Sequence, residues 1–182
     1  MKREAKKRAM AATYALMQTM GFDSITVKTI CDTAGISRKS FYVYFQDKYD
    51  VITQTFIEDG IATVYTLREY GLNSTSIMTG MYGNMLRKKD FYLKAIHIQG
   101  RHSLLNIMTQ EIQKMNRKLL KTQSMDEVDK EYISYYFAAS HAMILLKWIS
   151  EGMVVPPEKM AYYFDILEVS AMVPILENPR QA

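Results

Sequence analysis

The chain has 182 residues, of which 48% are hydrophobic and 23% charged, and it contains a single cysteine. This composition excludes a disordered chain, which lacks apolar residues, and a disulfide-stabilised secreted domain, which needs paired cysteines. The longest unbroken apolar run, residues 142–146, is far shorter than the roughly 18 residues of a membrane span. No apolar stretch follows the basic N-terminus, as it would in a secretory signal. We therefore expect a cytoplasmic protein that does not contact a membrane.

The excess positive charge is confined to the first quarter of the chain. Residues 1–50 contain nine Lys or Arg and five Asp or Glu, whereas residues 51–182 contain fourteen of each sign. This asymmetry indicates an anionic partner for the N-terminal segment alone, and nucleic acid is the commonest such partner.

The N-terminal segment predicts short helices with clear boundaries. Thr26, Ser37 and Asp47 have side chains suited to cap helices. Gly21 is suited to end the first helix in the left-handed conformation, and Gly35 is expected to break the second. The first four helices are expected at residues 2–20, 27–34, 38–45 and 48–70.

The rest of the chain keeps apolar residues three and four positions apart, and its four prolines all lie in the last fifth. Acidic residues open a long helix that Gly152 ends, and Pro156–Pro157 begins the next one. The later helices are expected at residues 76–87, 90–99, 103–121, 126–151 and 157–174. The fold is therefore predicted to be all-α, with about nine helices in two domains, residues 1–50 and 51–182.

Two short helices joined by Gly35, the second capped by serine, have the sequence form of a helix-turn-helix. In that motif the second helix lies in the major groove, and its first residues reach the base edges. Ser37, Arg38 and Lys39 occupy these positions, and arginine and lysine are the usual donors to guanine. The motif predicts binding to double-stranded DNA.

The segment GFDSITVKTICDTAGISRKSFYVYFQDKYDV, residues 21–51, resembles the N-terminal domain of the TetR family of transcriptional regulators. The resemblance extends over about residues 5–52. Cys31, Tyr44 and Val51 stand where alanine, histidine and leucine are common, but none of these differences removes a DNA-contacting group. The resemblance implies an all-α regulator with a helix-turn-helix domain followed by a helical C-terminal domain.

The resemblance also implies roles for individual residues, with phosphate contacts supplying affinity and base contacts supplying sequence preference. The implied DNA-contacting residues are Thr26, Lys28, Ser37, Arg38, Lys39, Tyr42, Tyr44 and Lys48. Phe41 and Phe45 are four residues apart and are expected in the core. Tyr44 is equally compatible with packing, and Cys31 is expected to be a small buried residue, with redox sensing as the alternative.

Residues 132–153 and 157–176 are apolar on more than one helical face, which is too much for a single packing contact. The resemblance implies that these helices pair with a second copy in a four-helix bundle, so that the protein is a homodimer; the alternative is an internal core. The expected interface residues are Tyr136, Ala139, Ser140, Met143, Phe164, Leu167 and Ala171.

Members of the family often hold an effector between the DNA-binding domain and the dimer helices, and methionine gives such a pocket an adaptable lining. The candidate effector residues are Met81, Tyr82, Met85, Tyr92, His97, His102 and Met108, with ordinary core packing as the alternative. The two histidines are five residues apart, which argues against a metal pair. The C-terminal region also resembles regulators related to the activator of dihydroxyacetone kinase operons, some of which answer to a partner protein.

The sequence thus predicts a dimeric, sequence-specific transcriptional regulator, acting as a repressor released by a small-molecule effector. The alternatives are a regulator, or even an activator, controlled by a protein partner, and a helical protein-interaction module without DNA binding. No nucleophile motif, phosphate-binding glycine loop, H-E-x-x-H motif or carboxylate pair occurs, so we expect neither enzymatic activity nor a cofactor or metal.

Overall fold

The computed structural model describes residues 2–177, and these residues are helical with no strand among them. The helices are α1 (Lys2–Thr19), α2 (Val27–Ala34), α3 (Arg38–Tyr42), α4 (Lys48–Phe56), α5 (Ala62–Glu69), α6 (Ser74–Arg87), α7 (Lys89–Ala95), α8 (Leu104–Leu120), α9 (Glu127–Ser150), α10 (Pro157–Phe164) and α11 (Ser170–Glu177). The π turn η2 (Ile57–Ile61) joins α4 to α5, and the π turn η4 (Asp165–Val169) joins α10 to α11. Over the described residues the chain therefore forms nine continuous helical segments, and the all-α prediction is confirmed.

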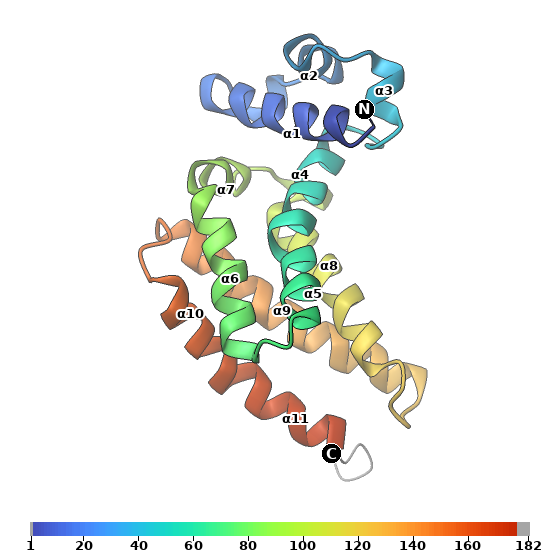
Figure 1. Cartoon of the computed structure of the whole chain (residues 1–182), viewed down its shortest axis with the longest axis vertical. Helices are drawn as coiled ribbons and strands as arrows, with labels where there is room; N and C mark the ends of the chain where they lie inside the picture. Colours follow the sequence, from blue (N-terminus) through green and yellow to red (C-terminus); the bar gives the residue numbers. More distant parts are fainter. Residues whose placement is uncertain (1, 178–182) are drawn as a thin grey trace.

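The helices form two groups that α4 connects. In Figure 1, α1, α2 and α3 lie together at one end, and α4 leads from them into the body formed by α5 to α11. Within the body α8 packs along α9, and α6 packs along α10. One hydrophobic core runs through both groups, from Ala9 in α1 to Ala161 in α10.

The predicted caps explain why the helices begin where they do. Thr26 and Thr29 form a reciprocal capping box at the start of α2, and Ser37 accepts a hydrogen bond from the Ser40 amide at 3.0 Å. Asp47 accepts two backbone amides at the start of α4, and Asp126 accepts one at the start of α9. These side chains satisfy amides that have no partner within the helix.

Gly21 differs from the prediction. It lies in an extended conformation, with φ −63° and ψ 144°, so it is not a left-handed cap. The chain instead enters the 3-10 turn η1 (Phe22–Ser24), and the Phe22 side chain enters the core. Gly35 ends α2 as predicted, and it does so in the left-handed conformation, with φ 60°.

Three helix ends also differ from the prediction. The third helix ends at Tyr42 rather than Phe45. The amides of Tyr44 and Phe45 both donate to the Phe41 carbonyl oxygen, so the chain forms a turn there. The sixth helix ends at Ala95, and a 3-10 turn, η3 (Gly100–His102), follows it. The last helix continues through Pro174 to Glu177, the last described residue, although proline has no amide hydrogen to donate within the helix.

Candidate DNA-binding surface and ligand cavity

The helix α3 is fixed by its inward aromatic side chains. Phe41 and Phe45 are buried, and their ring centroids lie 5.1 Å apart. The core position that the sequence predicts for both is therefore confirmed. Because these two rings hold α3 against its own domain, the other face of the helix is free to meet a partner.

The outward face of α3 carries hydroxyl, guanidinium and ammonium groups. Ser37, Arg38 and Lys39 are exposed, and Tyr42 is 50% exposed. An Arg38 Nη2 atom lies 3.4 Å from the Tyr42 hydroxyl, so the two side chains lie together on the surface. This face combines hydrogen-bond donors suited to base edges with donors suited to phosphates.

On α2, Thr26 and Lys28 are exposed, as a DNA contact requires. The Lys28 ammonium forms an exposed ion pair with Asp32 at 2.8 Å, one turn further along the helix. An exposed pair of this kind is weak, so exchanging Asp32 for a phosphate costs little. The Thr26 hydroxyl belongs to the capping box, which fixes the start of α2.

Tyr44 and Lys48 are only partly exposed, unlike the other six predicted DNA contacts. Tyr44 packs edge-on against Phe45 at a centroid distance of 6.4 Å. The Lys48 ammonium donates to the carbonyl oxygens of Phe22, Asp23 and Ile25 at 3.0, 3.0 and 2.9 Å. These three hydrogen bonds use all its protons, so Lys48 holds the turn before α2, and its phosphate contact stays a prediction.

The sequence did not single out Arg8 as a structural residue. Its Nη2 donates to the Gly35 carbonyl at 3.1 Å, which ties α1 to the turn between α2 and α3. Gly35 has φ +60°, a backbone conformation that residues with a Cβ atom rarely adopt, so glycine is needed there for its conformation. Cys31 is buried in the same domain, and burial raises the pKa of its thiol, as expected of a packed residue.

A buried carboxylate sits in the π turn between α4 and α5. Asp59 accepts hydrogen bonds from Lys88 Nζ at 2.7 Å and from the Tyr92 hydroxyl at 3.0 Å. Burial raises the pKa of Asp59, although the Lys88 ammonium opposes this shift. The network joins the α4–η2–α5 segment, which comes from the DNA-binding end, with α7 and the end of α6.

A cavity of about 320 Å³ lies in the body, between α5, α6, α8, α9 and the α10–α11 segment. Its size is at the lower end of the range for small-molecule sites. The residues around it are mainly aliphatic or aromatic: Val64, Tyr65, Arg68, Leu72, Ser74, Ile77, Met78, Ile112, Met115, Asn116, Leu119, His141, Phe164, Glu168, Val169 and Met172.

None of the seven predicted effector residues lines this cavity, so their role in effector binding stays a prediction. Five of them are at most 3% exposed and pack in the solid core: Met81, Tyr82, Met85, Tyr92 and Met108. His97 and His102 lie towards the DNA-binding end instead, where His102 stacks on Tyr49 at 4.3 Å. Helical periodicity marks the buried face of a helix, but it does not distinguish close packing from a hollow.

Three buried polar atoms along the cavity have no hydrogen-bond partner: Tyr65 Oη, His141 Nδ1 and Glu168 Oε1. His141 Nδ1 lies 3.8 Å from Glu168 Oε2, and its Nε2 lies 2.9 Å from the Tyr82 hydroxyl. Burial lowers the pKa of His141 to about 4 and raises the pKa of Glu168 to about 8. Near neutral pH both side chains are therefore uncharged, and the Glu168 carboxyl retains its proton.

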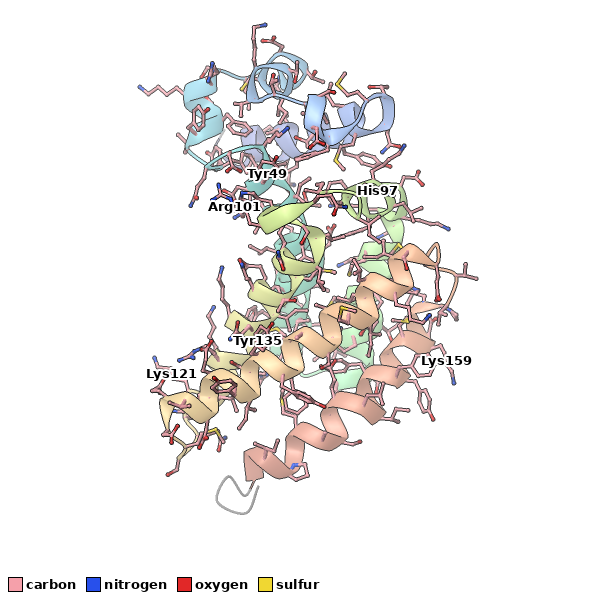
Figure 2. All side chains as sticks on the ribbon, turned by 180° about the vertical axis from the view of Figure 1, so that it is seen from behind. Tyr49, His97, Arg101, Lys121, Tyr135 and Lys159 are labelled. Carbon is pink, nitrogen blue, oxygen red and sulfur yellow. The ribbon has the colours of Figure 1, made fainter. Side chains whose placement is uncertain are left out.

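Helices α9 and α10–α11 expose apolar side chains on one face of the molecule, where Figure 2 shows no other helix in front of them. The exposed apolar residues of these two segments are Val128, Tyr132, Tyr135, Tyr136, Met143, Tyr162, Ile166 and Leu167. Of the predicted interface residues, Tyr136, Met143, Leu167 and Ala171 are exposed, and Ala139 and Ser140 are partly exposed. Phe164 instead lines the cavity and contacts the His141 ring at 5.1 Å.

Between residues 2 and 177, no helix is both long and apolar enough to cross a membrane. In the same part of the chain, His, Cys, Asp and Glu side chains form no group of three or more that could hold a metal ion.

Comparison with known proteins identifies the class to which this fold and surface belong. Residues 9–55 match the family model of the bacterial regulatory proteins of the TetR family, and residues 73–167 match that of a transcriptional regulator C-terminal region. The second match alone spans more than half of the chain. The protein is a transcriptional regulator and belongs to the TetR family, which confirms the resemblance that the sequence predicts.

Two solved structures share the fold. The dihydroxyacetone kinase operon activator DhaS is 21% identical over 95% of this chain and 96% of its own, with a TM-score of 0.57. A TetR-family transcriptional regulator from Syntrophomonas wolfei str. Goettingen is 13% identical over 95% of this chain and 97% of its own, also with a TM-score of 0.57. At these identities the likeness concerns the fold alone. No match was found among curated proteins.

Proposed function

We propose that the protein is a dimeric, sequence-specific repressor that binds operator DNA through residues 1–50 and releases it when a small molecule enters the cavity formed by residues 51–182. The observation that carries the DNA-binding part is the division of α3 into a buried aromatic face and an exposed face of donors, Ser37, Arg38 and Lys39. Such a helix can enter the major groove without losing its packing.

The proposed contacts divide into two kinds. Arg38 and Lys39, at the start of α3, contact base edges, while Lys28 and Tyr42 bind phosphates on either side. Lys48 contributes chiefly by fixing the turn before α2, so its effect on affinity is the same for every sequence.

Dimerisation is supported by the exposed apolar face of α9 and η4, which includes Tyr136, Met143 and Leu167. An apolar face of this extent is a common mark of a protein–protein interface. Pairing two chains along it supplies two recognition helices, and a helix-turn-helix protein reads two half-sites in this way.

Control by a ligand is supported by the position of α4 and α5. Tyr65 and Arg68 in α5 line the cavity, and the same helical segment begins with α4 at Lys48, after the short turn that follows the recognition helix α3. A ligand that binds one arrangement of this segment better than the other shifts the dimer towards or away from the spacing that DNA requires. The cavity favours a small molecule over a protein partner as the controlling ligand.

Fluorescence anisotropy with labelled duplexes from the region upstream of the gene tests DNA binding. The affinity should exceed that for random duplex and fall steeply as salt rises, because phosphate contacts release counterions. Arg38→Ala should reduce the preference for the specific duplex by about tenfold, the scale of one base contact of 1–3 kcal/mol. Lys159→Ala, which removes an exposed cation on α10, is the matched control and should change neither value.

Equal affinity for the upstream and random duplexes at physiological salt would contradict sequence-specific binding. In vitro transcription from the bound promoter then determines the sign of regulation. Lower transcript yield with the protein supports repression, and higher yield would instead identify an activator, a role that the printed name of DhaS gives to that protein.

A further inference from the structure

The cavity combines an apolar wall with three unsatisfied polar atoms. Glu168 is 6% exposed and His141 is 3% exposed, yet Glu168 Oε1 and His141 Nδ1 have no hydrogen-bond partner. The hydroxyl of Tyr65, on the opposite wall, is also buried without a partner. An unpaired buried polar atom costs free energy, so three around one hollow indicate a place that a ligand completes.

All three atoms can accept a hydrogen bond, His141 Nδ1 in the tautomer whose Nε2–H donates to the Tyr82 hydroxyl. An ammonium group has three donors and no acceptor, so it matches a carboxylate, an imidazole nitrogen and a hydroxyl oxygen. Among the described residues, Glu168 is the only acidic one that lines the cavity. Its pKa is raised to about 8, so binding of an ammonium group near neutral pH requires the carboxyl to release its proton, and the resulting carboxylate supplies the charge that a buried cation needs.

The cations near the cavity lie at its margin. Arg68 lines the cavity but is exposed, so water screens its charge. Lys118 is also exposed, and its ammonium lies 5.5 Å from the centroid of the Tyr65 ring. The acid of the cavity is therefore buried whereas the neighbouring lysine and arginine are exposed, which favours a cationic ligand inside.

The remaining wall favours an apolar body for this cation. Ile77 and Met78 of α6 and Ile112 and Met115 of α8 line the same hollow. Its volume of about 320 Å³ suits a molecule of modest size rather than a peptide or a lipid.

We propose that the cavity binds an apolar organic amine, whose ammonium group is held by Glu168 with His141 and Tyr65 as further acceptors. This inference rests on the proposed ligand-controlled function. Glu168 lies in the π turn η4, and π turns recur at functional sites because they alter the direction of a side chain. Binding of the amine supplies the partner that the carboxyl lacks, and it draws η4 towards α5 and α9.

Calorimetric titration of the full chain, without DNA, tests the proposal with three molecules of nearly equal shape: phenylbutylamine, phenylbutanol and phenylbutyrate. The amine should bind about tenfold or more tightly than the neutral alcohol, the scale of a charge-assisted contact, and phenylbutyrate should bind least tightly. Tighter binding of phenylbutyrate would overturn the proposal, because Arg68 would then hold an anion. Equal affinity for the amine and the alcohol would also overturn it.

Variants locate the ammonium group. Glu168→Gln keeps the shape of the side chain and should weaken amine binding about tenfold while leaving alcohol binding unchanged. The matched control is Asp165→Asn in the same π turn, because Asp165 pairs with Ser74 and is not among the residues lining the cavity. Equal loss in both variants would overturn the role of Glu168.

Tyr65→Phe provides a second variant, which removes only the hydroxyl, and it should weaken amine binding several-fold. If Glu168→Gln also lost alcohol binding, an unchanged amine affinity in Tyr65→Phe would overturn the proposal. Because no DNA is present, these results are independent of operator binding. A protein that binds the amine but no operator would contradict the proposed function alone, and the reverse would contradict only this inference.

Discussion

At the scale of single residues, Lys48 and Glu168 differ in how far their polar atoms are paired within the chain. Lys48 satisfies its three protons on the turn that precedes α2, so a surface charge acts as an internal brace. Glu168 has the opposite character, since one of its oxygens remains unpaired at the wall of the cavity. The hydrogen bonds of Lys48 are therefore satisfied within the chain, whereas those of Glu168 are not.

The Glu168 carboxyl makes stability depend on pH. Its pKa is about 8 in the folded protein against 4.5 for the free side chain, so the folded state keeps the proton that the unfolded chain loses. The free energy of unfolding should therefore fall by a few kcal/mol at most, on the order of the linkage for one buried group, as pH rises from about 4.5 to about 8. His141 acts in the opposite direction between about 4 and 6.5, because its pKa is lowered.

Urea unfolding at several pH values checks this prediction. The other titratable or charged side chains that line the cavity are His141 from α9 and Tyr65 and Arg68 from α5. Between pH 6.5 and 8 the native-state titration of His141 is complete, so the decline should be present in the wild type and reduced in Glu168→Gln. An identical decline in both proteins would show that Glu168 is not its source.

At the scale of elements, the α4–η2–α5 segment is the continuous link between the DNA-binding end and the cavity wall (Figure 1). Asp59 fixes its middle through Lys88 and Tyr92. We call the hydrogen bonds of Asp59 with Lys88 and Tyr92 the clamp. If a ligand moves α5, the clamp must either move with α5 or break. The clamp determines how rigidly the two ends are joined.

Breaking the clamp should destabilise the protein, and the losses caused by substitutions at Lys88 and Asp59 should not add. Lys88→Met leaves the buried Asp59 carboxylate with Tyr92 alone and should lower the free energy of unfolding by about 1–3 kcal/mol, a reduced value because Lys88 is 43% exposed on its side chain. Asp59→Asn in the same chain should then cost less than it does alone. Urea unfolding of the two single variants and the double variant measures this, and additive losses would contradict a direct interaction.

At the scale of the whole molecule, the apolar face of α9 and η4 lies on the side shown in Figure 2, while the recognition helix lies at the DNA-binding end. The proposed dimer and the proposed DNA contact therefore use separate surfaces of the chain. Both can be occupied at once, as a repressor requires.

The dimer predicts a loss of assembly when charge is placed on this face. Tyr136→Asp combined with Met143→Asp introduces two carboxylates at positions that are 68% and 53% exposed, so the folded monomer should tolerate them. Sedimentation velocity should then detect monomers, and operator affinity should fall by about two orders of magnitude because two linked half-sites no longer bind together. Tyr70→Asp, at a 77% exposed position after α5, is the control. A variant that remains dimeric would exclude this face as the interface.

The agreement between sequence and structure follows from how local each feature is. Thr26, Ser37 and Asp126 cap amides within three residues of themselves, so the starts of α2, α3 and α9 could be predicted from short stretches. Lys48 and Arg8 bond to carbonyls more than 20 residues away, and these partners have no sequence signal. The cavity requires five helical segments to meet, so its lining could not be identified from the periodicity of any one of them.

Trp148 is the only tryptophan in the sequence, and it is buried on α9. Its indole Nε1 donates to the Val155 carbonyl at 2.8 Å, and its ring meets Tyr82 edge-on at 5.7 Å. Tyr82 in turn contacts His141, so the indole is two contacts from the unpaired nitrogen. Trp148 is thus an intrinsic fluorescent probe. The emission of this tryptophan offers a label-free screen for compounds that bind the unmodified protein.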